Sequence, residues 1–498
     1  MAKRHIYLLF GFFALSLVAN AQNKAIEQYN QFKQQAHLDY DDFRKKCNAI
    51  YANFLRESWE SYKAGPIIPK PQDEVVPPVV MPGEDIDSPI EPKPIPIDSV
   101  VSPIFEEPAP QPKPISPIYE NENSSVESFT FTFFGTESKV RLPREQSKTI
   151  SRLNSQLSGD NLAAAWEELC KGDYDNLIRD CLELRIRHNL SDWAYLQMIS
   201  ELCEKYYGGH CNAATMLMSW IYCQTGYQLR SAIAGSKLYM LYGTQHLIYD
   251  LSYYVVDGVA FYPFLHKGEP MSDNIQICGA SFPEEKPMSL YIPFAQTLSE
   301  RLSSPRTIKS DRYPSAIATV QVNQNQLAFY NTYPPSMIGE NFCTRWEMYA
   351  NTPMAENIKM QLYPQLRKII EGKSQLDAAN ILLNWVQTGF IYEYDDKVWG
   401  EDRAFFAEES LFYPYCDCED RSILFTRLVR DLLGLKCILI YYPGHLACAV
   451  NFTESVNGDY INLNGVHFTI TDPTYIGAPV GYTMPDMDNK TATVILLN

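Results

Sequence analysis

The residues from Tyr413 to Phe425 read YPYCDCEDRSILF, and their pattern predicts a helix that begins at Cys418. Asp417 is of a type that caps helix N-termini, and Asp420 three residues later completes a capping pattern. Gly434 then ends the helix. Its buried face is predicted to contain Ile423, Leu424, Leu428 and Leu432. The sequence thus places one cysteine on the first turn of a buried helix.

The position of Cys418 affects the chemistry of its thiol. Unpaired backbone N–H groups and the positive end of the helix dipole stabilise a thiolate, so we expect a lowered pKa. The carboxylates of Asp417, Glu419 and Asp420 oppose this effect if they face the sulfur. A thiolate here would therefore also need an imidazolium beside it.

Three strands are predicted after this helix. Residues 435–442 (LKCILIYY) and 445–452 (HLACAVNF) are two of them, and residues 466–471 (VHFTIT) lead directly into Asp472. Antiparallel neighbours can bring His445, at the start of one strand, beside Asp472, at the end of another. Both side chains would then face the N-terminus of the helix that carries the cysteine.

Cys418, His445 and Asp472 are therefore the candidate catalytic residues. The thiolate would act as the nucleophile, the imidazole as base and acid, and the carboxylate would fix the imidazole tautomer. The Cys418 backbone N–H would supply one oxyanion donor, and the second donor is left open. No cofactor and no metal ion is predicted.

The cysteine that leads a helix, the Gly-His that opens a strand and the final Asp-Pro-Thr resemble the transglutaminase-like branch of the papain-like cysteine enzymes. The resemblance covers roughly Leu376 to Pro485, and it implies that Cys418, His445 and Asp472 are the catalytic triad. It also implies an α+β fold with a helix packed on an antiparallel sheet. One departure is Leu446-Ala447, since the family often has an aromatic residue beside the histidine.

The activity implied is acyl transfer from a peptide or carboxamide bond through a thioester. Hydrolysis is favoured over crosslinking, because water is abundant and nothing in the sequence specifies an amine acceptor pocket. A protein, a cell-wall peptide and a small amide all remain open as substrates. The alternative is an inactive domain that keeps the fold, in an interaction or scaffold protein of the cell envelope.

A metal site is a weaker reading of the same region. Cys416-x-Cys418 and His445-x-x-Cys448 resemble pairs of metal ligands. Residues three apart on a strand point to opposite faces, however, which argues against the second pair. Cys416 is also a rival nucleophile, but it precedes the predicted cap.

The N-terminus has the features of a signal peptide. A basic start at Lys3 and Arg4 is followed by an apolar stretch from Ile6 to Val18 and a small-x-small site ending at Ala21. We expect residues 1–21 to be removed and the protein to be periplasmic or secreted, without a lipid anchor and not integral to a membrane. The twelve cysteines are expected to be mostly buried free thiols, with one or two disulfides.

Two unusual segments precede the folded body. Residues 22–64 are predicted to form a helix with a heptad seam, which either mediates coiled-coil self-association or folds back on the body. Residues 66–117 contain 16 prolines, and the predicted linker, 65–118, is therefore expected to be an extended spacer that sets distance rather than stability. The net charge of −17 and the lack of a basic stripe argue against nucleic acid as a partner.

The body is predicted to divide into residues 119–335 and residues 336–498, both of α+β class. Cys211 opens a helix in the first part, followed by strand-like runs and His246, which echoes the arrangement around Cys418. Either the first part is a degenerate related domain, or it contains unrelated helices and strands. Cys211 and His246 are not candidate site residues.

Overall fold

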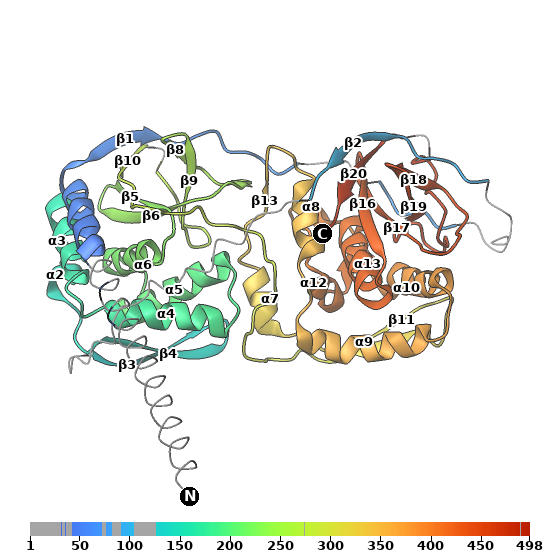
Figure 1. Ribbon diagram of the computed structural model, residues 1–498, viewed down its shortest axis with the longest axis horizontal. Helices are drawn as coiled ribbons and strands as arrows, with labels where there is room; N and C mark the ends of the chain where they lie inside the picture. Colours follow the sequence, from blue (N-terminus) through green and yellow to red (C-terminus); the bar gives the residue numbers. More distant parts are fainter. Residues whose placement is uncertain are drawn as a thin grey trace, which may run out of the picture.

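The computed structural model describes residues 31, 35, 42–71, 76–81, 91–103, 126–272, 274–488 and 490–498. It confirms a mixed α+β fold in which two six-stranded sheets lie at opposite ends of an elongated molecule, each covered by helices on one face (Figure 1). The first sheet has the order β1 (Trp59–Lys63), β10 (Asn274–Cys278), β5 (Leu229–Ala234), β6 (Lys237–Gly243), β9 (Val259–Pro263) and β8 (Tyr254–Val256).

The second sheet has the order β18 (Tyr460–Leu463), β19 (Val466–Thr471), β17 (His445–Asn451), β16 (Lys436–Tyr442), β20 (Ala492–Leu496) and β2 (Ile97–Val101). The smaller strand pairs are β3 (Val126–Phe133) with β4 (Thr136–Pro143), β11 (Arg306–Lys309) with β12 (Ile317–Val320), β7 (Leu247–Ile248) with β13 (Ser336–Met337), and β14 (Ile391–Tyr392) with β15 (Tyr415–Cys416).

Helices fill the space beneath the two sheets. Those of the first part are α2 (Lys148–Ser151), the 3-10 turn η1 (Arg152–Asn154), α3 (Gly159–Leu169), α4 (Asp175–Arg187), α5 (Asp192–Tyr207) and α6 (Asn212–Gln224). Those of the second part are α7 (Gln324–Tyr330), α8 (Thr344–Asn351), α9 (Glu356–Ile370), α10 (Gln375–Gly389), α11 (Asp395–Val398), α12 (Ala407–Phe412) and α13 (Cys418–Leu433). One hydrophobic cluster runs through both parts, from Tyr51 to Ile495.

The two sheets share one order of elements along the chain. In each, a helix (α6 or α13) leads into a hairpin (β5-β6 or β16-β17), and a second hairpin (β8-β9 or β18-β19) pairs with the far strand of the first. The last strand, β10 or β20, then returns to the other side of β5 or β16. A strand from the N-terminal segment, β1 or β2, forms the outer edge. The two sheets differ in strand direction only at this edge, because β2 pairs parallel with β20 and β1 pairs antiparallel with β10.

The N-terminal helix is shorter than predicted. Residues 42–57 are helical, but residues 59–63 form strand β1, because they pair with β10 along their whole length. Tyr51 and Leu55 are buried in the main core, so the helix packs on the body. Phe43, Ile50 and Phe54 of the predicted seam are 48%, 56% and 42% exposed, so self-association through this face stays a prediction. Residues 1–21, the predicted signal peptide, lie outside the described residues.

The proline-rich stretch is not a free spacer where it is described. Strand β2 extends the second sheet, Ile95 is buried against its outer face, and Val76 and Val79 pack beside it. An edge strand tolerates neighbouring prolines, because its outer N–H groups need no partner in the sheet. Residues 97–101 themselves contain none. The expectation that residues 65–118 contribute nothing to stability is therefore wrong for these parts.

Some of the remaining predictions are confirmed and others are wrong. The strands predicted at residues 435–442, 445–452 and 466–471 are confirmed to within one residue at their ends. All twelve cysteines are free and ten are buried, so the predicted disulfides do not form. Within the described part of the chain, no helix has the length and apolar character that crossing a membrane requires.

Candidate active site

Helix α13 presents Cys418 as its first residue, as predicted. Asp417 is the N-cap, its backbone N–H donates to the Asp420 carboxylate at 3.4 Å, and Gly434 ends the helix in a left-handed conformation with φ 67°. The Cys418 side chain is buried, with 3% of the residue exposed. The local signals in the sequence therefore define both ends of this helix.

Two buried side chains fix α13 against the second sheet. The Ser422 hydroxyl donates to the Leu446 carbonyl oxygen of β17 at 2.9 Å. The Arg421 guanidinium donates to the carbonyl oxygens of Gln387 and Phe390 at 3.0 Å and of Pro473 at 3.4 Å. The helix N-terminus is thus held to the strand that begins at His445 and to the turn that follows Asp472.

His445 and Asp472 meet as predicted. His445 is the first residue of β17, Asp472 directly follows β19, and the two strands pair antiparallel. His445 Nε2 lies 2.9 Å from Asp472 Oδ2, and both residues are buried. Asp472 Oδ1 accepts the backbone N–H groups of Thr474 and Tyr475 at 2.8 and 3.2 Å. The carboxylate therefore both caps its turn and orients the imidazole.

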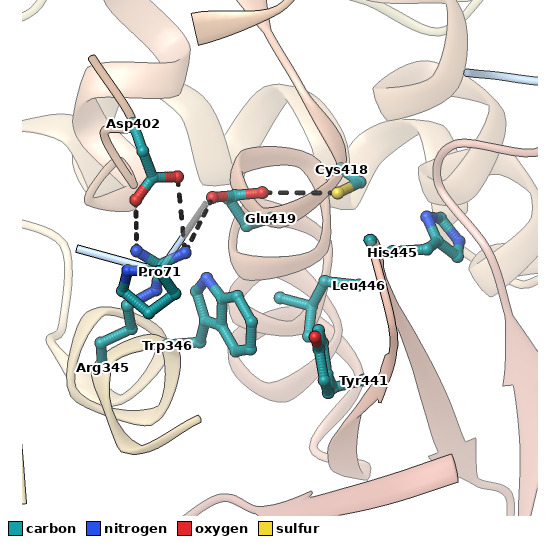
Figure 2. A pocket seen from close by; sticks show the side chains of 10 residues that line it. Pro71, Arg345, Trp346, Asp402, Cys418, Glu419, Tyr441, His445 and Leu446 are labelled. Atoms are coloured by element: carbon teal, nitrogen blue, oxygen red, sulfur yellow. Dashed lines mark hydrogen bonds and ion pairs between the residues drawn. The ribbon is translucent and has the colours of Figure 1, made fainter. Parts of the chain in front are cut away.

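The other imidazole nitrogen of His445 is available. Nδ1 is buried and has no hydrogen-bond partner within the described parts of the chain. His445 and Cys418 line the same small pocket of about 40 Å³, together with Glu419, Gly444 and Leu446, and Figure 2 shows Cys418 between Glu419 and His445. The pocket has room for about one water molecule.

The pKa of Cys418 is raised, contrary to our expectation. Burial is the largest cause, followed by the charges of Glu419 and Asp417. The thiol donates to Glu419 Oε2 at 3.4 Å, and a backbone N–H from Leu446 opposes the shift only in part. The helix N-terminus does not overcome two adjacent carboxylates in a buried site, so the sulfur carries its proton in this state.

A network of acidic side chains extends behind Glu419. Glu419 Oε1 lies 3.8 Å from an Arg345 guanidinium nitrogen, and Arg345 also pairs with Asp402 (Figure 2). Burial, followed by the charge of Glu419, raises the pKa of the nearby Asp395 to about 8. Arg345 thus faces the carboxyl groups of Glu419 and Asp402, and the neighbouring Asp395 keeps its proton at neutral pH.

Tyr392 is a further residue near the site that sequence reasoning missed. Its hydroxyl is buried without a hydrogen-bond partner in the described chain, and its ring lies against Arg421, with 5.2 Å between the guanidinium carbon and the ring centroid. Burial, then the charge of Cys418, raises the pKa of Tyr392. Tyr392 is singled out by its position on β14, beside β15 and the start of α13. This position depends on the tertiary structure.

The proline-rich stretch borders the pocket. Pro71 is one of the lining residues (Figure 2), and Lys70 Nζ lies 2.9 Å from Glu401 Oε2. Further along, the Val76 backbone N–H donates to the Gly444 carbonyl oxygen at 2.9 Å, one residue before His445. Described residues on both sides of positions 72–75 are therefore fixed beside the site.

The rival readings of the cysteines find no support in the geometry. Cys416 is buried outside the pocket lining, and burial raises its pKa to about 11. The Cys448 thiol donates a hydrogen bond to the Thr471 carbonyl oxygen at 3.1 Å. Among the described residues, no group of three or more side chains close enough to share an ion contains both Cys416 and Cys418 or both His445 and Cys448.

The first part repeats the order of helix and strands found around Cys418, but His246 does not take the place of His445. Cys211 is the N-cap of α6 rather than its first residue. His246 lies between β6 and β7, is fully buried, and contacts Ser336 Oγ and the Leu290 backbone N–H, both at 3.2 Å. The residue that opens the second strand, as His445 does, is Lys237.

Comparisons of the chain with protein-family models, with curated proteins and with solved structures find no match. The functional reading therefore depends on the residues themselves.

Proposed function

We propose that the protein is an exported cysteine enzyme of transglutaminase-like type, which acts on peptide or carboxamide bonds through Cys418, His445 and Asp472. One observation carries the proposal. Asp472 holds His445 Nε2 at 2.9 Å, which leaves Nδ1 unpartnered beside the pocket that Cys418 also lines. With the Nε2 proton directed to the carboxylate, Nδ1 can accept a proton.

The raised pKa of Cys418 determines how the first step proceeds. Because the resting thiol is protonated, His445 Nδ1 takes its proton as Sγ attacks the carbonyl carbon, and the carbonyl π electrons move to oxygen. The Cys418 backbone N–H is the donor that we assign to the resulting oxyanion.

The intermediate then collapses to a thioester. The C–N bond breaks, and the amine leaves with the proton from His445. A water molecule next gives a proton to His445 and attacks the thioester, the C–S bond breaks, and the thiol recovers its proton as the acid leaves. We favour hydrolysis over transfer to an amine because water is abundant at an exported site.

A second candidate is a catalytically inactive scaffold or interaction protein of the envelope. The observation that favours it is the small size of the site, because the pocket holds only about 40 Å³, Pro71 borders it, and a carboxylate faces the sulfur. In this reading the triad residues are retained for packing.

Residue-resolved alkylation distinguishes the two candidates. The full chain is treated with iodoacetamide between pH 6 and 10, and the modification of each cysteine is followed by peptide mass spectrometry. The enzyme proposal predicts that Cys418 reacts faster than the equally buried Cys437, and that His445→Ala slows Cys418 while the control His467→Ala does not. Equal rates at Cys418 and Cys437, unaffected by His445→Ala, would instead favour the scaffold.

A further inference from the structure

A second group of chemically active side chains lies in the first part of the molecule, at the end of α5. Glu204 Oε1 lies 3.1 Å from His210 Nδ1 and 2.6 Å from His266 Nε2. The two imidazole nitrogens are 3.1 Å apart, with their rings nearly perpendicular at 79°. Three donor atoms from three separate segments thus converge on one point.

The spacing of these atoms fits a small transition-metal ion. Zinc binds imidazole nitrogen and carboxylate oxygen at ~2.0–2.1 Å in a tetrahedron, whose edges are then ~3.3 Å. The three observed separations, 2.6, 3.1 and 3.1 Å, come close to one face of such a tetrahedron. The side chains of Glu204, His210 and His266 are 23%, 27% and 43% exposed, so a fourth position is open to solvent.

Glu269 supports both histidines from behind. Its Oε2 lies 3.5 Å from His210 Nε2, the ring nitrogen that faces away from Glu204, and accepts the His266 backbone N–H at 3.1 Å. Its Oε1 pairs with Lys237. A carboxylate on the far nitrogen of a ligand histidine fixes the tautomer that metal binding needs.

The backbone is shaped for the same convergence. Helix α5 ends at Gly208, and Gly208 and Gly209 have φ values of 81° and 145°, in the region that side chains disfavour. This turn brings His210 back over the last turn of α5, where Glu204 lies.

Two of the three residues of the cluster lie at chain positions comparable to those around the candidate triad. Lys237 opens β6 opposite Ala234, as His445 opens β17 opposite Tyr442. His266 follows the end of β9, as Asp472 follows the end of β19, and His210 and Cys211 directly precede α6, as Asp417 precedes α13. His266 and His210 therefore lie at positions that match the second sheet, whereas Glu204 lies on α5 and has no counterpart in the triad.

We propose that Glu204, His210 and His266 bind one Zn²⁺ ion, with Glu269 as the residue that orients the ligands and a solvent-accessible fourth position. Two imidazoles and a carboxylate are a donor set that zinc accepts in sites that retain an open position. The proposal is independent of the chemistry at Cys418.

Metal titration of the full chain tests this site. After EDTA treatment and its removal, Zn²⁺ binding is measured by calorimetry, and Co²⁺ is used as a spectroscopic probe. We expect one equivalent to bind, with visible Co²⁺ bands and no intense near-ultraviolet thiolate band. His266→Gln and Glu204→Gln should weaken Zn²⁺ binding by about 100-fold or more, and Glu269→Gln by about 10–100-fold.

Two variants serve as controls. His467→Gln removes an exposed histidine of the second sheet, and Cys418→Ala removes the candidate nucleophile, so both should bind Zn²⁺ as the unaltered chain does. The far-ultraviolet circular dichroism of each variant checks its fold. Unchanged affinity in His266→Gln, a Co²⁺ complex with thiolate bands, or the absence of stoichiometric binding would each overturn the assignment.

Discussion

The two sheets have the same order of elements, but they carry different residues at matching strand and helix ends. His445 opens the second strand of the second sheet and faces a carboxylate, whereas Lys237 opens the equivalent strand of the first sheet. Cys418 begins its helix, while Cys211 only precedes one. The same order of helix and strands therefore supports a candidate nucleophile in one place and a histidine and carboxylate cluster in the other. The framework defines where chemistry can occur, and single residues at strand and helix ends define which chemistry.

The largest effect is expected from Cys418→Ala, and Cys211→Ala is its counterpart in the first sheet. Cys418→Ala should reduce peptide or carboxamide hydrolysis to the uncatalysed rate, because no other group can form the thioester. Cys211→Ala should leave turnover unchanged within about twofold, as expected for surface changes away from a site. The measurement is hydrolysis of a peptide and carboxamide panel, with the acyl-enzyme detected by intact mass. Loss of activity in Cys211→Ala would show that the first sheet takes part in the reaction.

Asp472→Asn should lower turnover by about 10³–10⁴-fold while the melting temperature stays nearly constant. The amide oxygen can still accept the N–H groups of Thr474 and Tyr475, so the turn is kept. The amide nitrogen, however, now donates to His445 Nε2. The imidazole proton then moves to Nδ1, which can no longer accept the thiol proton.

Steady-state kinetics and thermal melting of the purified variant check this outcome. Near-normal turnover in Asp472→Asn would reduce the site to Cys418 and His445 alone.

Much of this site could be predicted from local sequence. Asp417, Asp420 and Gly434 mark the ends of α13, and the apolar runs around His445 define β16 and β17 to within one residue. The pairing of His445 with Asp472 follows from antiparallel neighbours, because strand ends then meet. Such patterns need no knowledge of distant residues.

What could not be predicted depends on contacts between distant segments. The raised pKa of Cys418 results from burial beside Glu419, whose partner Arg345 comes from a distant helix and also pairs with Asp402. Strand β2 lies in a proline-rich stretch and forms only because β20 offers an open edge. Helix α7 was missed although Asn323 caps it, since its side chain accepts the Asn325 backbone N–H. That capping signal was present in the sequence.

The next prediction concerns the carboxylate at the sulfur. Glu419→Gln should increase the alkylation rate of Cys418 at pH 7 several-fold, because removing this negative charge lowers the pKa of the thiol and raises the thiolate population. The charge of Glu419 is the second cause of the raised thiol pKa, after burial. Glu401→Gln, which alters an exposed carboxylate paired with Lys70, serves as the matched control. If both variants react at the original rate, burial alone controls the thiol.

The smallest expected effect is on stability, and it tests the group of buried carboxyl groups beside Cys418. Burial, followed by the charge of Glu419, raises the pKa of Asp395 from 3.8 to about 8 in the folded protein. The unfolded chain releases this proton near pH 4, while the folded protein keeps it until about pH 8. The stabilisation is therefore fully present below pH 4 and is lost as the pH rises through that window.

Asp395→Asn should remove this dependence, because an amide does not titrate and its oxygen can still accept the Arg403 backbone N–H. We expect the melting temperature of the variant to exceed that of the original chain by about 1–3 °C at pH 8, with little difference at pH 4. Asp396→Asn, at an exposed neighbouring position, should give no such change. Calorimetric scans at pH 4, 6 and 8 make the comparison. If the variant melts at a lower temperature than the original chain at pH 8, Asp395 is ionised and stabilises the fold. Arg345 alone would then have to balance the negative charges of this group of carboxylates.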